Sequence, residues 1–297
     1  MTIAFLGPRG SFSEVAAITY DPQADLLPQP NFPAIVAATE RGEAVAGLLA
    51  VENSIEGAIA SNLDILIHDT QLQICGEVVV PVRHCLVVRP GASLADIREV
   101  TSHPQALAQC RKSLERLVPG ATPVAALSTS GAVEEVSRGD DPTRAAIGTE
   151  RAAALYGGEI AARDIQDVAA NVTRFVAIAA RDAAPTGDDK TSLAFTVKKN
   201  VPGSLHKVLT AFAEAGLQLT KVESRPSKAW LGDYVFLVDL AGHRSDPHVA
   251  AAIARAEDSC YWLKVFGSYP RFPMESLRSI IEPDDAGAAE RMGVDTR

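Results

Sequence analysis

Lysine is scarce in the first two-thirds of this 297-residue chain, where Lys112 is the only lysine before Lys190. Enzymes that form a Schiff base or bind pyridoxal phosphate need a lysine in their pocket. Lys112 lies in the segment 109–113, whose residues are typical of an exposed helical face. The sequence therefore disfavours covalent catalysis by an amine.

Paired cysteines, long apolar runs and basic clusters are absent as well. Cys75, Cys85, Cys110 and Cys260 show no CxxC spacing, which argues against a zinc site and a disulfide framework. There is no secretory signal and no apolar run of about 20 residues, so we expect a cytoplasmic protein with no membrane partner. The net charge of −9 disfavours nucleic acid. The turn 7–10 has neither the dinucleotide GxGxxG pattern nor a phosphate-loop lysine.

The residues that are present suit two globular domains. A hydrophobic fraction of 47% and a charged fraction of 22% are ordinary for a protein with a full core. The first part alternates apolar runs, small-residue turns and Ala-rich stretches, which predicts an α/β domain with a largely parallel sheet. Strands are expected at 3–6, 45–51, 78–88 with a bend near Pro81, 99–101, 125–127, 145–148 and 175–179.

The second part begins after a polar linker and has a different pattern. It predicts strands at 191–198, 217–224, 234–240 and 261–269, with helices at 203–216 and 247–258. This βαββαβ order is the ferredoxin-like arrangement. We place the first domain at 1–183, the linker at 184–190, the second domain at 191–272 and a tail with little to bury at 273–297.

Five segments of the first part share one design, in which an apolar strand is followed by a small polar turn and usually by a helix. They are 7–14, 52–57, 102–109, 128–132 and 171–175. Helix N-termini present unpaired N–H groups that suit anions, and in α/β sheets such turns gather at the carboxyl ends of strands. Capping alone explains any single turn, but the five together predict one binding site.

The turn 171–175 carries the most chemistry, because it joins an amide, a hydroxyl and a permanent cation: Asn171, Thr173 and Arg174. This set suits an anionic substrate that must also receive a proton. Other polar residues have simpler interpretations. We expect His84 to pack in the core and His103 to cap a helix or support a neighbour, and no spacing of His, Cys and Asp resembles a metal site.

These segments resemble the prephenate dehydratase family. The matching stretches are GPRGSFS at 7–13, VENSIEG at 51–57, SHPQALAQC at 102–110, STS at 128–130 and IQDVAANVTRF at 165–175. The second domain is similar to an ACT regulatory domain, with NVPGSL at 200–205, ESRP at 223–226 and GSYPR at 267–271. Two departures are visible. Ala50 stands where the family often has Pro, and Ser204-Leu205-His206 differs from the usual Ala-Leu-Val, which leaves the effector's identity and affinity open.

The resemblance implies a catalytic domain of two α/β lobes, like a periplasmic binding protein, with the site in the cleft between them. The implied reaction converts prephenate to phenylpyruvate with loss of CO₂ and water. Most decarboxylations need an electron sink, but here the substrate's own ring accepts the electrons and becomes aromatic. No cofactor is therefore expected.

We hypothesise roles for single residues in this reaction. Thr173 would donate a hydrogen bond or proton to the departing hydroxyl, and Arg174 would face a substrate carboxylate. Asn171 and Phe175 complete the catalytic turn. The substrate-binding residues implied are Ser11, Glu52, Asn53, Ser54, Ser102, Gln109, Ser128 and Thr129.

Regulation would follow from the second domain. The family implies feedback inhibition by L-phenylalanine at the interface of two paired ACT domains, in a homodimer or homotetramer. The effector residues implied are Gly203, Ser204, Leu205, Glu223, Ser224, Arg225 and Pro226. Two alternatives stay open from the sequence: an arogenate dehydratase, and a non-catalytic protein that senses amino acids.

Overall fold

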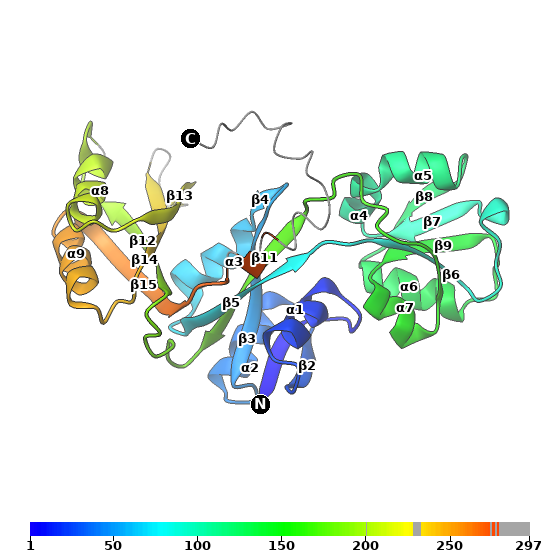
Figure 1. Cartoon of the computed structure of the whole chain (residues 1–297), viewed down its shortest axis with the longest axis horizontal. Helices are drawn as coiled ribbons and strands as arrows, with labels where there is room; N and C mark the ends of the chain where they lie inside the picture. The colour runs from blue at the N-terminus through cyan, green and yellow to red at the C-terminus, as the bar shows by residue number, and fades with distance from the viewer. Residues whose placement is uncertain (200, 228–232, 274, 277, 279–297) are drawn as a thin grey trace.

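A computed structural model describes residues 1–199, 201–227, 233–273, 275–276 and 278, and it has three parts in a row (Figure 1). The central part, lobe 1, contains a mixed sheet of order β2-β1-β3-β11-β5, with β4 paired to β3. Its strands are β1 (Thr2–Leu6), β2 (Asp25–Gln29), β3 (Ala46–Asn53), β4 (Gly57–Ala58), β5 (Gln73–Pro81) and β11 (Val172–Ala179).

Lobe 1 has four helices, and the first two begin at side-chain caps. The four helices are α1 (Phe12–Tyr20), α2 (Phe32–Glu40), α3 (Ala60–Asp64) and the π-helix η1 (Ile65–Asp69). Asn31 caps α2, because its Oδ1 accepts from the Ala34 N–H at 2.9 Å, and Pro33 occupies the first turn, where no N–H is needed.

Lobe 2 lies on one side of lobe 1 and has its own sheet, of order β10-β6-β9-β7-β8 (Figure 1). Its strands are β6 (Cys85–Val88), β7 (Glu99–Ser102), β8 (Thr122–Ala125), β9 (Arg144–Gly148) and β10 (Glu159–Ala162). Its helices are the 3₁₀-helix η2 (Leu94–Asp96), α4 (Pro104–Gln109), α5 (Arg111–Leu117), α6 (Thr129–Arg138) and α7 (Glu150–Tyr156). The chain enters lobe 2 between β5 and β6 and returns between β10 and β11.

Some expected strands differ from the structure. The stretch 78–88 is two strands in separate lobes, since Pro81 ends β5 and the chain crosses over before β6. The sheets are mixed, because β11 is antiparallel to both of its neighbours. The strand expected at 125–127 lies earlier, in β8, and Leu127 is fully exposed. We did not predict β2 or β10; β2 contains a proline, and both are short edge strands.

The C-terminal domain lies on the opposite side of lobe 1 (Figure 1). Its elements are β12 (Asp189–Val197), α8 (Ser204–Glu214), β13 (Leu219–Pro226), β14 (Tyr234–Ala241), α9 (Pro247–Glu257) and β15 (Cys260–Pro270). The sheet has the order β13-β14-β12-β15, so the ferredoxin-like βαββαβ prediction is confirmed. Most of the tail expected at 273–297 lies outside the described residues.

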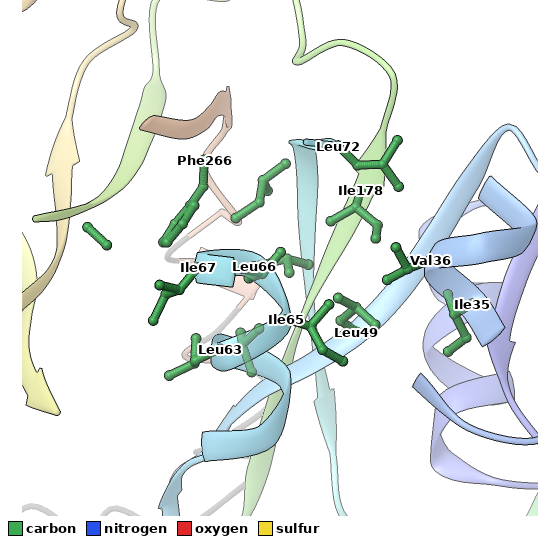
Figure 2. Packing of buried hydrophobic residues seen from close by; sticks show 14 of the residues in the cluster. Ile35, Val36, Leu49, Leu63, Ile65, Leu66, Ile67, Leu72, Ile178 and Phe266 are labelled. Atoms are coloured by element: carbon green, nitrogen blue, oxygen red, sulfur yellow. The ribbon is translucent and has the colours of Figure 1, made fainter. Parts of the chain in front are cut away.

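The C-terminal domain shares a hydrophobic core with lobe 1. Its buried Leu237, Phe266 and Tyr269 belong to the same cluster as residues of η1 and β3, and Phe266 lies beside Ile67 and Leu66 (Figure 2). Burial of each such side chain contributes about 1.5–3 kcal/mol. Gly267 allows the close approach, because a Cβ at this position would be 2.2 Å from the Ile74 carbonyl oxygen. The two parts are therefore packed as one body.

A lysine of the C-terminal domain also binds backbone carbonyl groups at the end of η1. The Lys264 ammonium donates to the carbonyl oxygens of Leu66 at 2.8 Å, Ile67 at 3.2 Å and Thr70 at 2.6 Å. The last carbonyls of a helix have no partner within the helix, so Lys264 satisfies them from the neighbouring domain.

Candidate active site

A cavity of about 400 Å³ lies between the two lobes. Every one of the five polar segments predicted from the sequence contributes to its wall. Lobe 1 supplies Phe12, Asn53, Glu56, Gly57, Ala58, Ile59, Thr173 and Phe175, the crossover supplies Val82 and His84, and lobe 2 supplies His103, Gln105, Ala106, Gln109 and Thr129. The five segments thus meet at one hollow although they are up to about 160 residues apart in sequence.

Thr173 is held in the cavity wall by Asn53, which is also bonded to Asn171. The Asn53 Oδ1 accepts from the backbone N–H groups of Ile55 at 3.0 Å and Glu56 at 3.1 Å, which fixes the orientation of its amide. The Asn53 Nδ2 then donates to Asn171 Oδ1 at 2.8 Å and to Thr173 Oγ1 at 3.0 Å. Because Thr173 Oγ1 accepts from Asn53, its own proton is free to point at a ligand.

A second chain of hydrogen bonds spans the cleft from lobe 1 to lobe 2. Gln109 Nε2 donates to Glu56 Oε1 at 3.0 Å, and Gln109 Oε1 is 3.0 Å from His84 Nε2. His84 is 2% exposed, and burial lowers the pKa of its imidazole. A neutral His84 therefore donates from Nε2 to Gln109, which in turn donates to the Glu56 carboxylate.

The cavity wall offers neutral donors to an anion. No arginine or lysine is among the described residues that line it. Thr129 is the first residue of α6, so the N–H groups and partial positive charge of that helix lie at the cavity. His103 also lines the cavity and caps α4, its Nδ1 accepting from the Gln105 N–H at 3.3 Å.

The expectation that Arg174 and Glu52 face the substrate is wrong. Both residues lie within strands, not in turns, and side chains of a strand alternate between its faces. Asn53 and Thr173 point into the cavity, so Glu52 and Arg174 point to the other side of the sheet. There Glu52 Oε2 is 3.1 Å from the Lys221 ammonium of β13.

Arg174 lies in a buried ionic network between lobe 1 and the C-terminal domain. Its Nε donates to Glu77 Oε2 at 2.7 Å, its Nη1 to Asp239 Oδ2 at 2.7 Å and its Nη2 to the Tyr269 hydroxyl at 2.8 Å. Lys190 donates to both oxygens of Glu77, at 2.8 and 2.9 Å. The two cations and two carboxylates balance in charge, so the guanidinium is fully engaged by the protein.

The pKa directions agree with this pairing. Burial by itself opposes the charged forms, but the neighbouring opposite charges outweigh it. They raise the pKa of Arg174 well above its ordinary value and lower the pKa of both Glu77 and Asp239. The guanidinium and both carboxylates therefore stay ionised at neutral pH.

Four other predicted substrate ligands have structural partners instead and are not part of the cavity wall described above. Ser102 is buried and donates to the Ile147 carbonyl at 2.7 Å. Ser54 donates to the Ala170 carbonyl and accepts from the Val172 N–H, which fastens the start of β11. Ser128 and Ser11 cap α6 and α1.

The predicted effector residues divide between two surfaces. Gly203 caps α8 with a φ of 86°, and Ser204 and Leu205 follow it in the first turn. Both β12 and β13 are antiparallel to β14, so this turn lies at the same end of the sheet as the exposed Ser224 and Pro226. Glu223 and Arg225 point to the opposite face.

On that face the two side chains have partners. Glu223 is paired with Lys221 at 3.1 Å. Arg225 is 9% exposed, and it contacts Asp64 at 2.8 Å and donates to the Ala60 carbonyl at 2.6 Å. Arg225 thus joins the domain to α3 and is not available to an effector.

The structure also adds residues that we did not assign to the site. Phe12, Glu56, His84, His103 and Gln105 line the cavity. Glu56 is four residues from Glu52 in the sequence, and only the turn after β3 shows that Glu56 faces the cleft.

Within the ranges that the structure covers, no helix is long and apolar enough to cross a membrane. In the same ranges no group of three His, Cys, Asp or Glu side chains is arranged to hold a metal ion.

Comparison with known proteins places this architecture in a family. The family model for prephenate dehydratase matches residues 3–183, and the model for the ACT domain matches residues 191–258. A bifunctional chorismate mutase/prephenate dehydratase of Aquifex aeolicus is 40% identical over 270 residues, which cover 91% of this chain and 73% of that protein. An arogenate dehydratase/prephenate dehydratase of Arabidopsis thaliana is 38% identical, over 90% of this chain and 72% of that protein.

Solved structures agree with the fold. A prephenate dehydratase from Arthrobacter aurescens in complex with L-Phe superposes with a TM-score of 0.83 at 35% identity, over 91% of this chain and 90% of that one. A structure described as a novel type of quorum quenching acylase superposes equally well, with a TM-score of 0.83 at 34% identity, over 93% of this chain and all of that one. The matched domains, in the order and with the cleft described above, show that the chain belongs to the prephenate dehydratase family, as an enzyme whose dehydratase domain is followed by an ACT domain.

Proposed function

We propose that the cavity between the lobes binds prephenate and converts it to phenylpyruvate, CO₂ and water. The observation that carries the proposal is the orientation of Thr173, whose oxygen accepts from Asn53 and whose proton is left for a ligand. The ring of the substrate accepts the electrons of the departing CO₂ and expels its hydroxyl as it becomes aromatic. A dianion thereby yields one carboxylate and one hydroxide, and solvent supplies the proton that makes water.

Thr173 assists the step at which the hydroxyl leaves. Its O–H donates to the departing oxygen as negative charge develops there, which stabilises the transition state more than the ground state. A neutral hydroxyl is a weak acid, so aromatisation supplies most of the driving force. Asn53 orients this donor and is itself bonded to Asn171, and Phe175 supplies part of the apolar wall.

The two carboxylates of the substrate need different treatment. The one that remains is best held by charge and N–H groups, and the N-terminus of α6 at Thr129 provides these. The one that leaves as CO₂ must lose its charge, and tight pairing would oppose that loss. The absence of arginine and lysine from the described cavity wall suits this asymmetry.

The test is Thr173→Ala compared with Thr173→Ser. We expect Thr173→Ala to lower kcat by about 100-fold, the ordinary effect of a lost transition-state donor, with KM nearly unchanged. Thr173→Ser retains the hydroxyl and should keep most of the rate. Near-normal formation of phenylpyruvate by Thr173→Ala would remove Thr173 from the mechanism.

L-Phenylalanine is the effector that we propose for the ACT domain. The prephenate dehydratase of Arthrobacter aurescens was solved in complex with this amino acid. The exposed Ser224 and Pro226 of β13 and the turn at Gly203 lie at one end of the sheet, where a second copy in a homodimer or homotetramer could complete a pocket. Inhibition requires that phenylalanine bind two states of the cleft unequally, by about 1–3 kcal/mol.

Titration of activity with phenylalanine tests the regulation. Ser224→Ala should raise the half-inhibitory concentration without changing the uninhibited kcat. Thr210→Ala on the outer side of α8 is the control, since its hydroxyl bonds only within that helix. An unaltered enzyme that responds to no aromatic amino acid would defeat this part of the proposal.

Two other activities are suggested by relatives. Arogenate differs from prephenate by an amino group on the side chain, and comparison of kcat/KM on both substrates decides the preference. An acylase activity, for which one of the similar solved structures is named, needs a nucleophile hydrogen-bonded to a base. The described bond of Thr173 is to Asn53, which is not a base, so the geometry favours dehydration. A pure amino-acid sensor would form no phenylpyruvate at all.

A further inference from the structure

The turn between β1 and α1 reaches out of lobe 1 and docks on lobe 2. Ser130 Oγ and the Tyr156 hydroxyl both donate to the Arg9 carbonyl, the latter at 3.0 Å. Thr149 Oγ1 donates to the Gly10 carbonyl at 2.5 Å. Three hydroxyls from α6, α7 and the residue that caps α7 therefore hold two consecutive carbonyls of the other lobe.

Gly10 is at the point of closest approach. Its φ is +82°, in the region that favours glycine. A Cβ at this position would be 2.6 Å from Ser130 Oγ and 2.9 Å from Ala152 Cα, and the second of these is backbone of lobe 2. Any side chain here would push the lobes apart.

Glu14 fastens the same turn from inside. Its side chain is fully buried, and its Oε2 accepts from the Gly10 N–H at 2.5 Å. Its Oε1 accepts from Arg9 Nε at 3.0 Å, and Arg151 of lobe 2 lies 3.4 Å from both carboxylate oxygens. Burial opposes the charge, but these donors outweigh it and lower the pKa of Glu14. The anion bound in this turn is therefore the protein's own carboxylate.

The docked turn is next to both walls of the cavity. Phe12 follows Gly10 by two residues, and Thr129 precedes Ser130 by one; both line the cavity, from opposite lobes. The Phe12 ring also meets the His84 ring edge-on at 5.3 Å. The separation of the cavity walls thus depends on how the turn is seated.

From this geometry we propose that the turn 9–14 is an interlobe latch, in which Gly10 and Glu14 are positioning residues that hold Phe12 and Thr129 at the spacing the substrate needs. The inference rests on the proposed function, because it concerns the same cavity. With the latch broken, the lobes separate, and substrate must close them at the expense of its own binding energy. The apparent affinity for substrate is then reduced in proportion to the fraction of molecules that are closed, while saturating substrate restores the closed state.

Gly10→Ala and Gly42→Ala are the matched pair for the test. Both glycines have a positive φ, and nothing lies within 4 Å of a Cβ at Gly42. The φ angles are +82° and +73°, so the backbone strain of the two variants is similar and the difference between them reports the collision with lobe 2. We expect Gly10→Ala to raise KM for prephenate about tenfold with kcat within twofold of the unaltered enzyme, and Gly42→Ala to change neither.

A double variant, Ser130→Ala with Tyr156→Phe, removes two latch donors without a collision. It decides the question if Gly10→Ala does not fold, and a KM raised about fivefold or more is expected. A general loss of stability would lower the measured kcat, because a smaller fraction of the protein is folded and active, and it would leave KM unchanged. An unchanged KM in the folded variants, whatever happens to kcat, overturns the latch.

Distances between spin labels at Gln23→Cys of lobe 1 and Glu115→Cys of lobe 2 give a readout that needs no turnover. Both positions are exposed. The distribution should broaden and lengthen when the latch is broken, and an unchanged distribution counts against it. An unaltered enzyme that shows no dehydratase activity refutes the proposed function, and the label distances still decide on the latch.

Discussion

Replacement of Arg174 by leucine is the sharpest test of the network that joins the catalytic sheet to the ACT domain. The change leaves Glu77 and Asp239, with side chains 2% and 9% exposed, facing Lys190 as their one remaining cation within the network. Removal of one partner from a buried ion pair costs about 3–5 kcal/mol, because the other charge stays buried without compensation. In a chain of this size each kcal/mol shifts Tm by about 2–4 °C, so Tm should fall by about 10 °C.

The double variant Arg174→Leu with Asp239→Leu decides whether the cost is electrostatic. It restores the balance of charge, since Lys190 and Glu77 remain as a pair at 2.8 Å. We expect the double variant to recover most of the lost stability, as apolar replacements of buried pairs usually do. Arg111→Leu, which breaks an exposed pair with Glu115, should leave Tm unchanged. Urea and thermal unfolding measure all four proteins. A double variant no more stable than Arg174→Leu would refute the reasoning, because the loss would then not come from a buried charge without compensation.

Three further predictions concern single features. Glu56→Gln removes a negative charge from the wall of a site for a dianion. Charges 4 Å apart in water repel by about 1 kcal/mol, so KM should fall about fivefold. A fall in kcat would instead show that Glu56 supplies the proton. The pKa of Glu77 and of Asp239 is lowered in the folded state. As pH falls, these carboxylates therefore bind protons in the unfolded chain before they do so in the folded protein. Their contribution to the free energy of unfolding is then complete above about pH 5 and is lost as pH falls below about 4; urea midpoints from pH 3 to 7 should show a shallower acid decline in Glu77→Gln. Gly267→Ala places a Cβ 2.2 Å from the Ile74 carbonyl, so it should lower the urea midpoint far more than Gly42→Ala does, and equal midpoints would contradict the close packing of β15 on β5.

The sequence predicted the elements of the site better than the direction of its side chains. The polar segments beside apolar runs contain Asn53, Gln109 and Thr173, which line one cavity, because strand ends in α/β sheets meet at one edge. Arg174 was misplaced because the turn at 171–174 was thought to end before the strand, whereas β11 begins at Val172. A shift of one residue in a strand reverses the face.

Contacts between residues far apart in the sequence could not be predicted from the sequence either. The groups that bind Arg174 are 65 to 97 residues away and come from three different strands. The spacing of Ser11 and Glu14 is typical of a helix start, and Ser11 accepts from the Glu14 N–H at the start of α1. It did not show that the Glu14 carboxylate folds back onto Gly10 and that the turn serves the other lobe. Such contacts depend on tertiary packing, which local pattern does not contain.

Side chains alternate between the two faces of β3 and β11, so this pair of strands contributes to two different sites. Asn53 and Thr173 are hydrogen-bonded on the cavity face, and Glu52 and Arg174, each one residue away, contact Lys221 and Asp239 of the ACT sheet on the other. A strand is too stiff to move one residue without its neighbour, so a shift of the ACT sheet that pulls on Arg174 must also move Thr173. Displacement of the Thr173 hydroxyl by a fraction of an ångström would suffice, since a misplacement of 1 Å costs about 100-fold in rate. An effector bound at the site proposed near Ser224 would therefore have a mechanical path to the proposed donor, Thr173, through β11.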